Sequence, residues 1–230
     1  MITKQGVTLA VKAAKIEFGR LRQQMVDAQL RPRGIHDPRV LAAMLAVPRE
    51  EFVADALRSE AYDDRPLPIG AGQTISQPFT VAYMAQAAEL LGDEKILEVG
   101  TGSGYGAAVL SHLGAKVHTI ERIGSHARRA SDTLLRMGYV NVQVHLGDGS
   151  LGLAAESPFD VIVVTAGAAA LPPSYIEQIA EGGRIVIPIG KHRSEQRLHR
   201  FRNQRGTLLI DDLGSFAFVP LIGDEGWPTT

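Results

Sequence analysis

The strongest local signal in the sequence is LEVGTGSGYG, residues 97–106. An apolar strand-like run ends at Val99, glycines follow at positions 100, 102 and 104, and a helix-like segment comes next. Glycines at such a junction let the backbone turn sharply and approach a ligand closely, while the amides of the helix face that ligand. The spacing is not the dinucleotide fingerprint, because Tyr105 stands where the third glycine would be. Instead, Glu98 lies two residues before the first glycine and gives the pattern E-x-G-x-G-x-G.

From residue 94 onward, short apolar strands alternate with helices. The expected strands are KILEVG, KVHTIE, VQVHLGDG, FDVIVVTAG and RIVIPIG, and the segments between them read as helices, including SYIEQIAEGG at 174–183. This alternation predicts an α/β fold with a Rossmann-like, doubly wound, mostly parallel sheet. Residues 197–223 read as strands separated by turns, which predicts an antiparallel hairpin at the sheet edge.

Two further acidic residues end the strands that follow the glycine loop. A carboxylate at Glu121 could accept both ribose hydroxyls of a nucleotide, and Asp148 with the amide of Gly149 could face an adenine edge. Each feature alone has an ordinary explanation: a turn, a surface charge or a helix cap. Their order on successive strands favours a nucleotide-like ligand. The candidate cofactor-binding residues are Glu98, Gly100, Thr101, Gly102, Ser103, Gly104, Glu121, Arg122, Asp148 and Gly149.

The first ninety residues read as helices followed by a long loop. Asp37 is expected to cap a helix that has Pro38 at its first position. Residues 61–78 are expected to form the loop, and long ordered loops inside compact domains are often functional. Within it, GAGQTISQP at 70–78 fits no regular element. On the residues alone, Ser76 is best interpreted as a cap of the helix that begins near Pro78.

The composition is that of an ordinary soluble globular protein. The chain has 230 residues, 45% of them hydrophobic and 21% charged, with a formal net charge of −1. This balance gives no reason to expect binding to nucleic acid or to an acidic membrane. The absence of cysteine excludes disulfides, thiolate catalysis and zinc–thiolate sites. No apolar run could cross a bilayer and no signal peptide is recognisable, so we expect a cytoplasmic protein, and nothing demands more than a monomer.

Two other features favour structural interpretations. His112, His118, His126 and His145 fall on separate elements without ligand spacing, so no metal site is expected. The basic stretch at 191–205 alternates like an exposed hairpin, and we interpret it as a solvated sheet edge that discourages strand pairing.

The glycine loop, Glu121 and GDG together resemble the class I S-adenosylmethionine-dependent methyltransferases. Longer segments narrow the resemblance to the protein-L-isoaspartate O-methyltransferase family over about residues 25–227. They are MVDAQLRPRGIHDPRVLAAMLAVPREEFV, AYDDRPLPIGAGQTISQP, ILEVGTGSGYGAAVLS, GDGSLG, PFDVIVVTAG, GGRIVIPIG and FVPLIGDEGW. The chain departs from the family in reading TAGAAALPP where TAAAP is usual and GYGAA where GYQAA is commoner, and residues 1–24 have no counterpart.

The resemblance implies a protein-repair enzyme that moves a methyl group from S-adenosylmethionine to the free α-carboxylate of L-isoaspartyl residues in damaged peptides and proteins. It assigns Ser76 as the active-site residue, and Gln73, Thr74 and Ile75 would shape the substrate pocket with it. Such a carboxylate is already ionised at neutral pH, so no general base is needed. The chain would be one methyltransferase domain: residues 1–90 with helices and the substrate loop, a cofactor-binding core over 91–190 and a C-terminal hairpin over 191–230.

Three other functions share some of these features. A methyltransferase of the same fold could act on RNA or a small metabolite, but RNA is disfavoured by an aromatic content of 6% and the slightly negative charge. A non-catalytic S-adenosylmethionine-binding module would be expected to lack the loop serine or a cofactor acid, and both are present. A nicotinamide dehydrogenase is disfavoured because the fingerprint fails.

Overall fold

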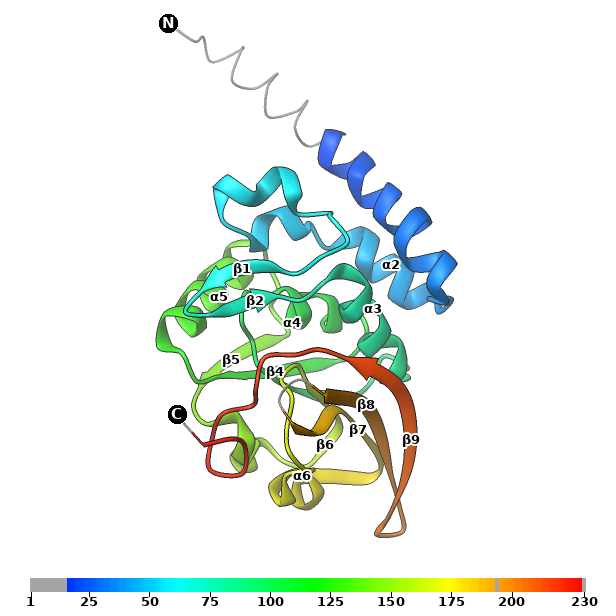
Figure 1. The fold of residues 1–230 in the computed structure, drawn as a ribbon, viewed down its shortest axis with the longest axis vertical. Helices are drawn as coiled ribbons and strands as arrows, with labels where there is room; N and C mark the ends of the chain where they lie inside the picture. Colours follow the sequence, from blue (N-terminus) through cyan, green and yellow to red (C-terminus); the bar gives the residue numbers. More distant parts are fainter. Residues whose placement is uncertain (1–15, 193–194, 229–230) are drawn as a thin grey trace, which may run out of the picture.

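The centre of the molecule is a seven-stranded sheet in the order β5-β4-β3-β6-β7-β8-β9 (Figure 1). The computed structural model describes residues 16–192 and 195–228. Strands β3 to β7 are parallel, and β8 and β9 run antiparallel beside β7. The strands are β3 (Lys95–Val99), β4 (Lys116–Glu121), β5 (Val142–Leu146), β6 (Phe159–Val164), β7 (Ile179–His192), β8 (Glu195–Gln204) and β9 (Thr207–Phe216). The predicted doubly wound sheet with an antiparallel edge hairpin is confirmed.

The order of the strands creates a switch point beside β3. The chain first adds β4 and β5 on one side of β3 and then returns to place β6 on its other side. The connections after β3 and β6 therefore leave the sheet in opposite directions, which opens a crevice at the carboxyl ends of these two strands. This crevice holds the candidate site.

Helices cover both faces of the sheet. Along β3, Ile96 packs in a core shared with α3 and α4, whereas Leu97 and Val99 point to the opposite face and share a core with Tyr175 of α6. The helices are α3 (Pro78–Ala87), α4 (Tyr105–Leu110), α5 (Gly124–Arg136) and α6 (Pro173–Gln178), with short 3₁₀ turns at Gly149–Leu151 and Ala154–Glu156. Alternation along a strand thus supplies two cores, as expected for a sheet buried on both faces.

The N-terminal elaboration is helical, as predicted. Residues 16–25 form a helix that continues as a π-helical segment, Val26–Leu30, and a 3₁₀ turn, Arg31–Arg33. Helix α2 (Pro38–Ala46) is capped by Asp37, whose carboxylate accepts hydrogen bonds from the amides of Arg39 and Val40. Two further 3₁₀ segments follow, at Arg49–Phe52 and Asp55–Glu60. In the part of the chain that the structure describes, no helix is long and apolar enough to cross a membrane.

The predicted loop at 61–78 is partly a β-hairpin, so that prediction was wrong in part. Strands β1 (Leu67–Gly70) and β2 (Gln73–Ile75) pair antiparallel, with Leu67 opposite Ile75 and both side chains buried. The alternation of Leu67 and Ile69 was masked by the prolines around them, which are unusual within strands.

The predicted helix at 174–183 is also too long. Helix α6 ends at Gln178, and Ile179 already belongs to β7, where it pairs with Phe159 of β6. The glycines at 182 and 183 lie at a bulge in β7, where the register with β6 shifts, and not at a helix end. Pairing with a neighbouring strand outweighs the local helical pattern.

The basic stretch at 191–205 is not a solvated sheet edge, because β9 covers β8 on its outer side. Arg200 pairs with Asp211 at 2.9 Å and with Glu89 at 2.6 Å, and Arg202 contacts the same two carboxylates. The basic strand is therefore neutralised from β9 and from the end of α3. Positions 193 and 194 lie outside the described residues.

Arg22 connects the N-terminal helix to the body, which gives a stability prediction. Its Nε donates to the Tyr62 hydroxyl at 2.7 Å and its Nη2 to Glu50 at 3.1 Å, with only 15% and 8% of the Arg22 and Glu50 side chains exposed. We expect Arg22→Met to lower the free energy of unfolding by about 3 kcal/mol, because it leaves a buried carboxylate without its cation. Urea denaturation would measure the change.

The matched control lies on the same helix. Arg20 pairs with Glu17 while 75% of its side chain is exposed, so Arg20→Met should cost less than about 0.5 kcal/mol. Equal losses for the two variants would contradict the proposed connection.

Candidate active site

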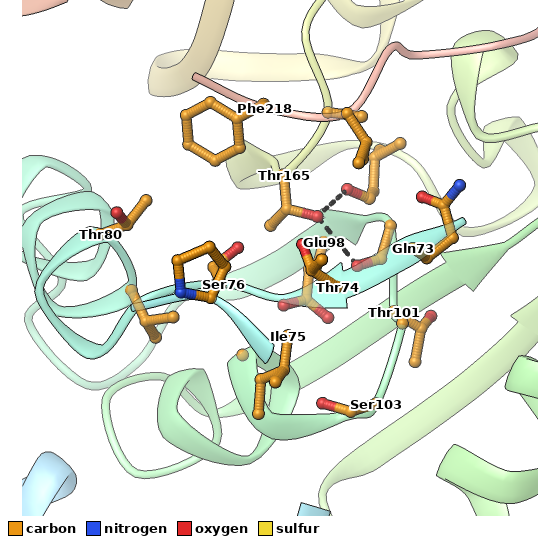
Figure 2. A pocket seen from close by; sticks show the side chains of 18 of the residues that line it. Gln73, Thr74, Ile75, Ser76, Thr80, Glu98, Thr101, Ser103, Thr165 and Phe218 are labelled. Carbon is orange, nitrogen blue, oxygen red and sulfur yellow. Dashed lines mark hydrogen bonds between the residues drawn. The ribbon is translucent and has the colours of Figure 1, made fainter. Parts of the chain in front are cut away.

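A cavity of about 510 Å³ opens at the carboxyl ends of β3, β4 and β6. The hairpin β1–β2 and the segment after β9 form its other walls, so Ser76 and the glycine loop face the same space (Figure 2). Most of the site residues predicted from the sequence line this cavity. They are Gln73, Thr74, Ile75, Ser76, Glu98, Gly100, Thr101, Gly102, Ser103, Glu121, Arg122 and Gly149.

Two of the predicted cofactor residues are not on the lining. Gly104 is the N-cap of α4. Asp148 turns its carboxylate to the C-terminal segment and accepts hydrogen bonds from the amides of Ser150 at 2.9 Å and Asp224 at 2.8 Å. Burial alone would raise the pKa of Asp148, but these bonds hold it below its ordinary value. The carboxylate anchors the tail, by which we mean the segment after β9. Gly223 has no Cβ and so permits this contact, since a Cβ at that position would lie 2.0 Å from Asp148 Oδ1.

Glu98 is a buried carboxyl group at the floor of the cavity, with 1% of its surface exposed. Its Oε2 accepts a hydrogen bond of 2.6 Å from the Thr119 hydroxyl, which lies 2.7 Å from the hydroxyl of Thr101. Burial raises the pKa of Glu98 to about 8, against the opposing effect of the Thr119 bond and with a smaller contribution from the nearby Glu121. Gly106 leaves room for this carboxyl, since a Cβ there would lie 2.2 Å from Glu98 Oε1.

Glu121 holds the glycine loop from the neighbouring strand. Its two oxygens accept hydrogen bonds of 2.9 Å from the amides of Gly102 and Ile123, and only 6% of the residue is exposed. Thr165, at the end of β6, holds the loop from the other side by donating to the carbonyls of Val99 and Gly100 (Figure 2). The loop is therefore fixed by residues from β4 and β6.

Ser76 lies between β2 and α3 and does not cap the helix. The N-cap position of α3 is Gln77, and no side chain there bonds to the helix amides. The side chain of Gln77 instead donates to Asp64 at 2.7 Å, and Asp64 also accepts two bonds of 3.1 Å from Arg33. The interpretation of Ser76 as a cap is thus wrong, and its half-buried hydroxyl faces the cavity.

Several lining residues were missed by sequence reasoning. The segment after β9 contributes Phe218, Leu221 and Ile222 to the lining, and Arg33 comes from the N-terminal helices. The segment after β9 is held at the stretch TAGAAALPP, residues 165–173, because the amide of Gly167 donates to the Val219 carbonyl at 2.8 Å. These contacts join segments far apart in the sequence, and no local pattern marked them.

The histidines lie away from the cavity lining. His118 and His145 come from the adjacent strands β4 and β5 and stack with 3.1 Å between Nδ1 and Nε2, which spacing along the chain did not reveal. Burial, with the nearby Lys116, lowers the pKa of His118 to about 4. Among residues 16–192 and 195–228, no group of three or more His, Cys, Asp or Glu side chains is placed to bind a metal.

A doubly wound sheet with a cavity at the carboxyl ends of its strands is typical of α/β proteins that bind nucleotide-like ligands. A family model described as "Protein-L-isoaspartate(D-aspartate) O-methyltransferase (PCMT)" matches residues 20–226. The chain belongs to this family.

Curated relatives and solved structures agree. Protein-L-isoaspartate O-methyltransferase 1 of Rhodopseudomonas palustris (strain HaA2) is 52% identical over 211 residues, which are 91% of this chain and 86% of that protein. The Protochlamydia amoebophila (strain UWE25) protein-L-isoaspartate O-methyltransferase is 51% identical over 207 residues, 90% of this chain and 99% of that protein. A solved protein-L-isoaspartate O-methyltransferase superposes with a TM-score of 0.81 at 31% identity, covering 89% of this chain and 67% of the other.

Glu98 gives a prediction of pH-dependent stability. The folded protein holds this proton more tightly than the unfolded chain, where the pKa is near 4.5, so its contribution to stability falls as the pH rises from about 4.5 to about 8. Glu98→Gln removes this pH dependence. The unfolding free energy of the variant minus that of the wild type should therefore be roughly 3–5 kcal/mol larger at pH 8 than at pH 5. Urea denaturation at each pH measures this difference.

Glu177→Gln, on an exposed position of α6, is the control and should follow the wild-type pH profile. The ¹³C resonance of the Glu98 carboxyl reports the same proton directly. A midpoint near pH 4.5 in the ligand-free protein would rule out the raised pKa.

Proposed function

We propose that this protein is an S-adenosylmethionine-dependent protein-L-isoaspartate O-methyltransferase. It moves a methyl group to the free α-carboxylate of L-isoaspartyl residues in damaged proteins. The observation that carries the proposal is one cavity with two parts: the glycine loop with its buried acids, and the Ser76 segment opposite (Figure 2). The chain would act as a single methyltransferase domain, a monomer in the cytoplasm, without nucleic acid or membrane partners.

The cofactor half of the cavity suits a cationic, nucleoside-bearing ligand. When bound, S-adenosylmethionine supplies an electrophilic methyl group on a positively charged sulfonium. The glycine loop would approach the ligand with its backbone, and the carboxyl groups of Glu98 and Glu121 would favour its positive charge. Arg122 and Gly149 would line the nucleoside end, while Asp148 and Gly104 would act indirectly, by holding the tail and by starting α4.

The substrate half has to position an anion. An α-carboxylate near pKa 3.5 is ionised at neutral pH, so the protein needs no base to activate it. The Ser76 hydroxyl would donate a hydrogen bond to this carboxylate and orient one oxygen, while Gln73 and Thr74 shape the opening and the buried Ile75 fixes the segment. Orientation of this kind is worth roughly 7–11 kcal/mol in favourable systems.

The C-terminal segment would exclude water from the reacting groups. Phe218, Leu221 and Ile222, whose side chains are apolar, all line the cavity. Removing water strengthens the interaction between an anionic substrate and a cationic ligand, because charges attract more strongly in a medium of low dielectric constant.

The direct experiment incubates the protein with labelled S-adenosylmethionine and matched peptides that carry aspartate or L-isoaspartate at one position. Base-labile label should enter only the isoaspartyl peptide. Transfer to RNA or a small metabolite alone would favour the alternative methyltransferase, and binding of the cofactor without transfer would favour a non-catalytic module. Either result would reject the proposal.

Ser76→Ala tests the positioning role. Loss of one hydrogen-bond donor at the reacting group should lower kcat by roughly 10²-fold, while the dissociation constant of S-adenosylmethionine changes less than threefold. Turnover and calorimetric cofactor binding would be measured together, with Ser125→Ala on the exposed surface of α5 as the control. An equal loss of turnover and cofactor affinity, or no loss of either, would count against the role of Ser76.

A further inference from the structure

Beside Ser76, the cavity has a wall of aromatic side chains, and the methyl transfer proposed above uses only one of them, Phe218. We define the aromatic wall as Phe79, Phe216 and Phe218, which line the cavity and are half-buried. They come from α3 and from the end of β9 with the residues that follow it. Rings that face a cavity and keep part of their surface exposed leave apolar area for a ligand to cover.

The wall is held from behind by Tyr83. Its ring centre lies 5.5 Å from that of Phe79 and 5.2 Å from that of Phe216, and its hydroxyl donates to the Leu213 carbonyl at 3.1 Å. Phe216 and Phe218 lie 6.2 Å apart. These spacings are within the range of favourable ring contacts, so the wall is a built surface whose position is set by packing.

Both ends of the wall are anchored by polar groups. The Arg33 guanidinium lies 3.6 Å from the centre of the Phe79 ring and pairs with Asp64, which also accepts a hydrogen bond from Gln77. At the other end, the Gln196 side chain donates to the Phe218 carbonyl and accepts from the Phe218 amide. The wall and the Ser76 segment are therefore fixed to each other through Gln77.

The geometry points to a subsite for the side chain of a residue adjacent to the isoaspartyl residue, with a preference for apolar and above all aromatic side chains. The inference rests on the proposed function, because the substrate carboxylate must lie at Ser76. Phe79 is only three residues beyond Ser76, in the first turn of α3, and the ordinary peptide bond on the N-terminal side of the isoaspartyl residue places the neighbouring Cα about 3.8 Å away. A carboxylate held at Ser76 thus brings an adjacent side chain to the wall.

The physical consequence is a difference in substrate affinity. An apolar side chain that covers half-buried rings leaves water, and an aromatic ring gains offset or edge contacts in addition. A glycine neighbour leaves the wall uncovered. We expect the Phe-flanked peptide to bind about tenfold more tightly than the Gly-flanked peptide, with the difference in KM and little change in kcat.

The test uses isoaspartyl peptides that carry Phe or Gly on the N-terminal or the C-terminal side of the isoaspartyl residue. Fluorescence anisotropy without methyl donor gives the dissociation constant, and turnover with S-adenosylmethionine gives KM and kcat. A tenfold Phe preference on one side supports the subsite. Equal affinity for Phe and Gly on both sides overturns it, whereas failure to methylate any of the peptides rejects the proposed function instead.

Variants locate the preference on the wall. Phe216→Ala should reduce the Phe-to-Gly affinity ratio to within about twofold, and Ile210→Ala on the same strand, where Ile210 is 61% exposed, should keep the full ratio. Phe79→Leu retains apolar volume without the ring and should lower the Phe-to-Gly affinity ratio at least threefold. This variant replaces Phe216→Ala as the test if Phe216→Ala does not fold. A ratio unchanged in a folded Phe216→Ala or Phe79→Leu protein contradicts the subsite.

Discussion

The reversal of winding at β3 places the candidate site, because the chain adds β4 and β5 on one side of β3 and β6 and β7 on the other. Because β4 and β6 flank β3 and the connections after β3 and β6 diverge, a crevice opens at the carboxyl end of β3. Glu98 lies one residue before that end and is buried there with a raised pKa. A buried carboxylate is costly in isolation and becomes favourable next to a bound cation, so the burial of Glu98 is consistent with the cationic cofactor proposed above.

Three parts of the chain close the crevice that this topology opens. The hairpin β1–β2 brings Ser76 over the glycine loop, the segment after β9 returns across the switch point, and the N-terminal helices supply Arg33 (Figure 1). Asp148 fixes the tail through the Asp224 amide, and Asp64 fixes the Ser76 segment through Gln77. Asp148, which the sequence suggested as a ligand contact, therefore holds one wall of the site, and Asp64 holds another.

The parts that the sequence predicted are those encoded locally. The glycine loop, the alternation of strands and helices and the Asp37 cap each depend on residues close together, and each is confirmed. The predictions of helix and strand bounds were wrong where contacts between distant segments determine the local structure. Ile179 joins β7 because it pairs with Phe159, and prolines concealed the hairpin at Leu67. The aromatic wall and the role of Asp148 were missed for the same reason, because their partners lie in distant segments of the chain.

In the proposed reaction, the Ser76 segment holds an anionic carboxylate against the cofactor that binds at the glycine loop. A crystal structure with S-adenosylhomocysteine and an isoaspartyl peptide tests this most directly. We expect the peptide carboxylate to lie within hydrogen-bonding distance of Ser76 Oγ, with the nucleoside between Glu121 and the segment after β9. A peptide bound outside the cavity, or a carboxylate remote from Ser76 while the cofactor product occupies the glycine loop, would contradict it.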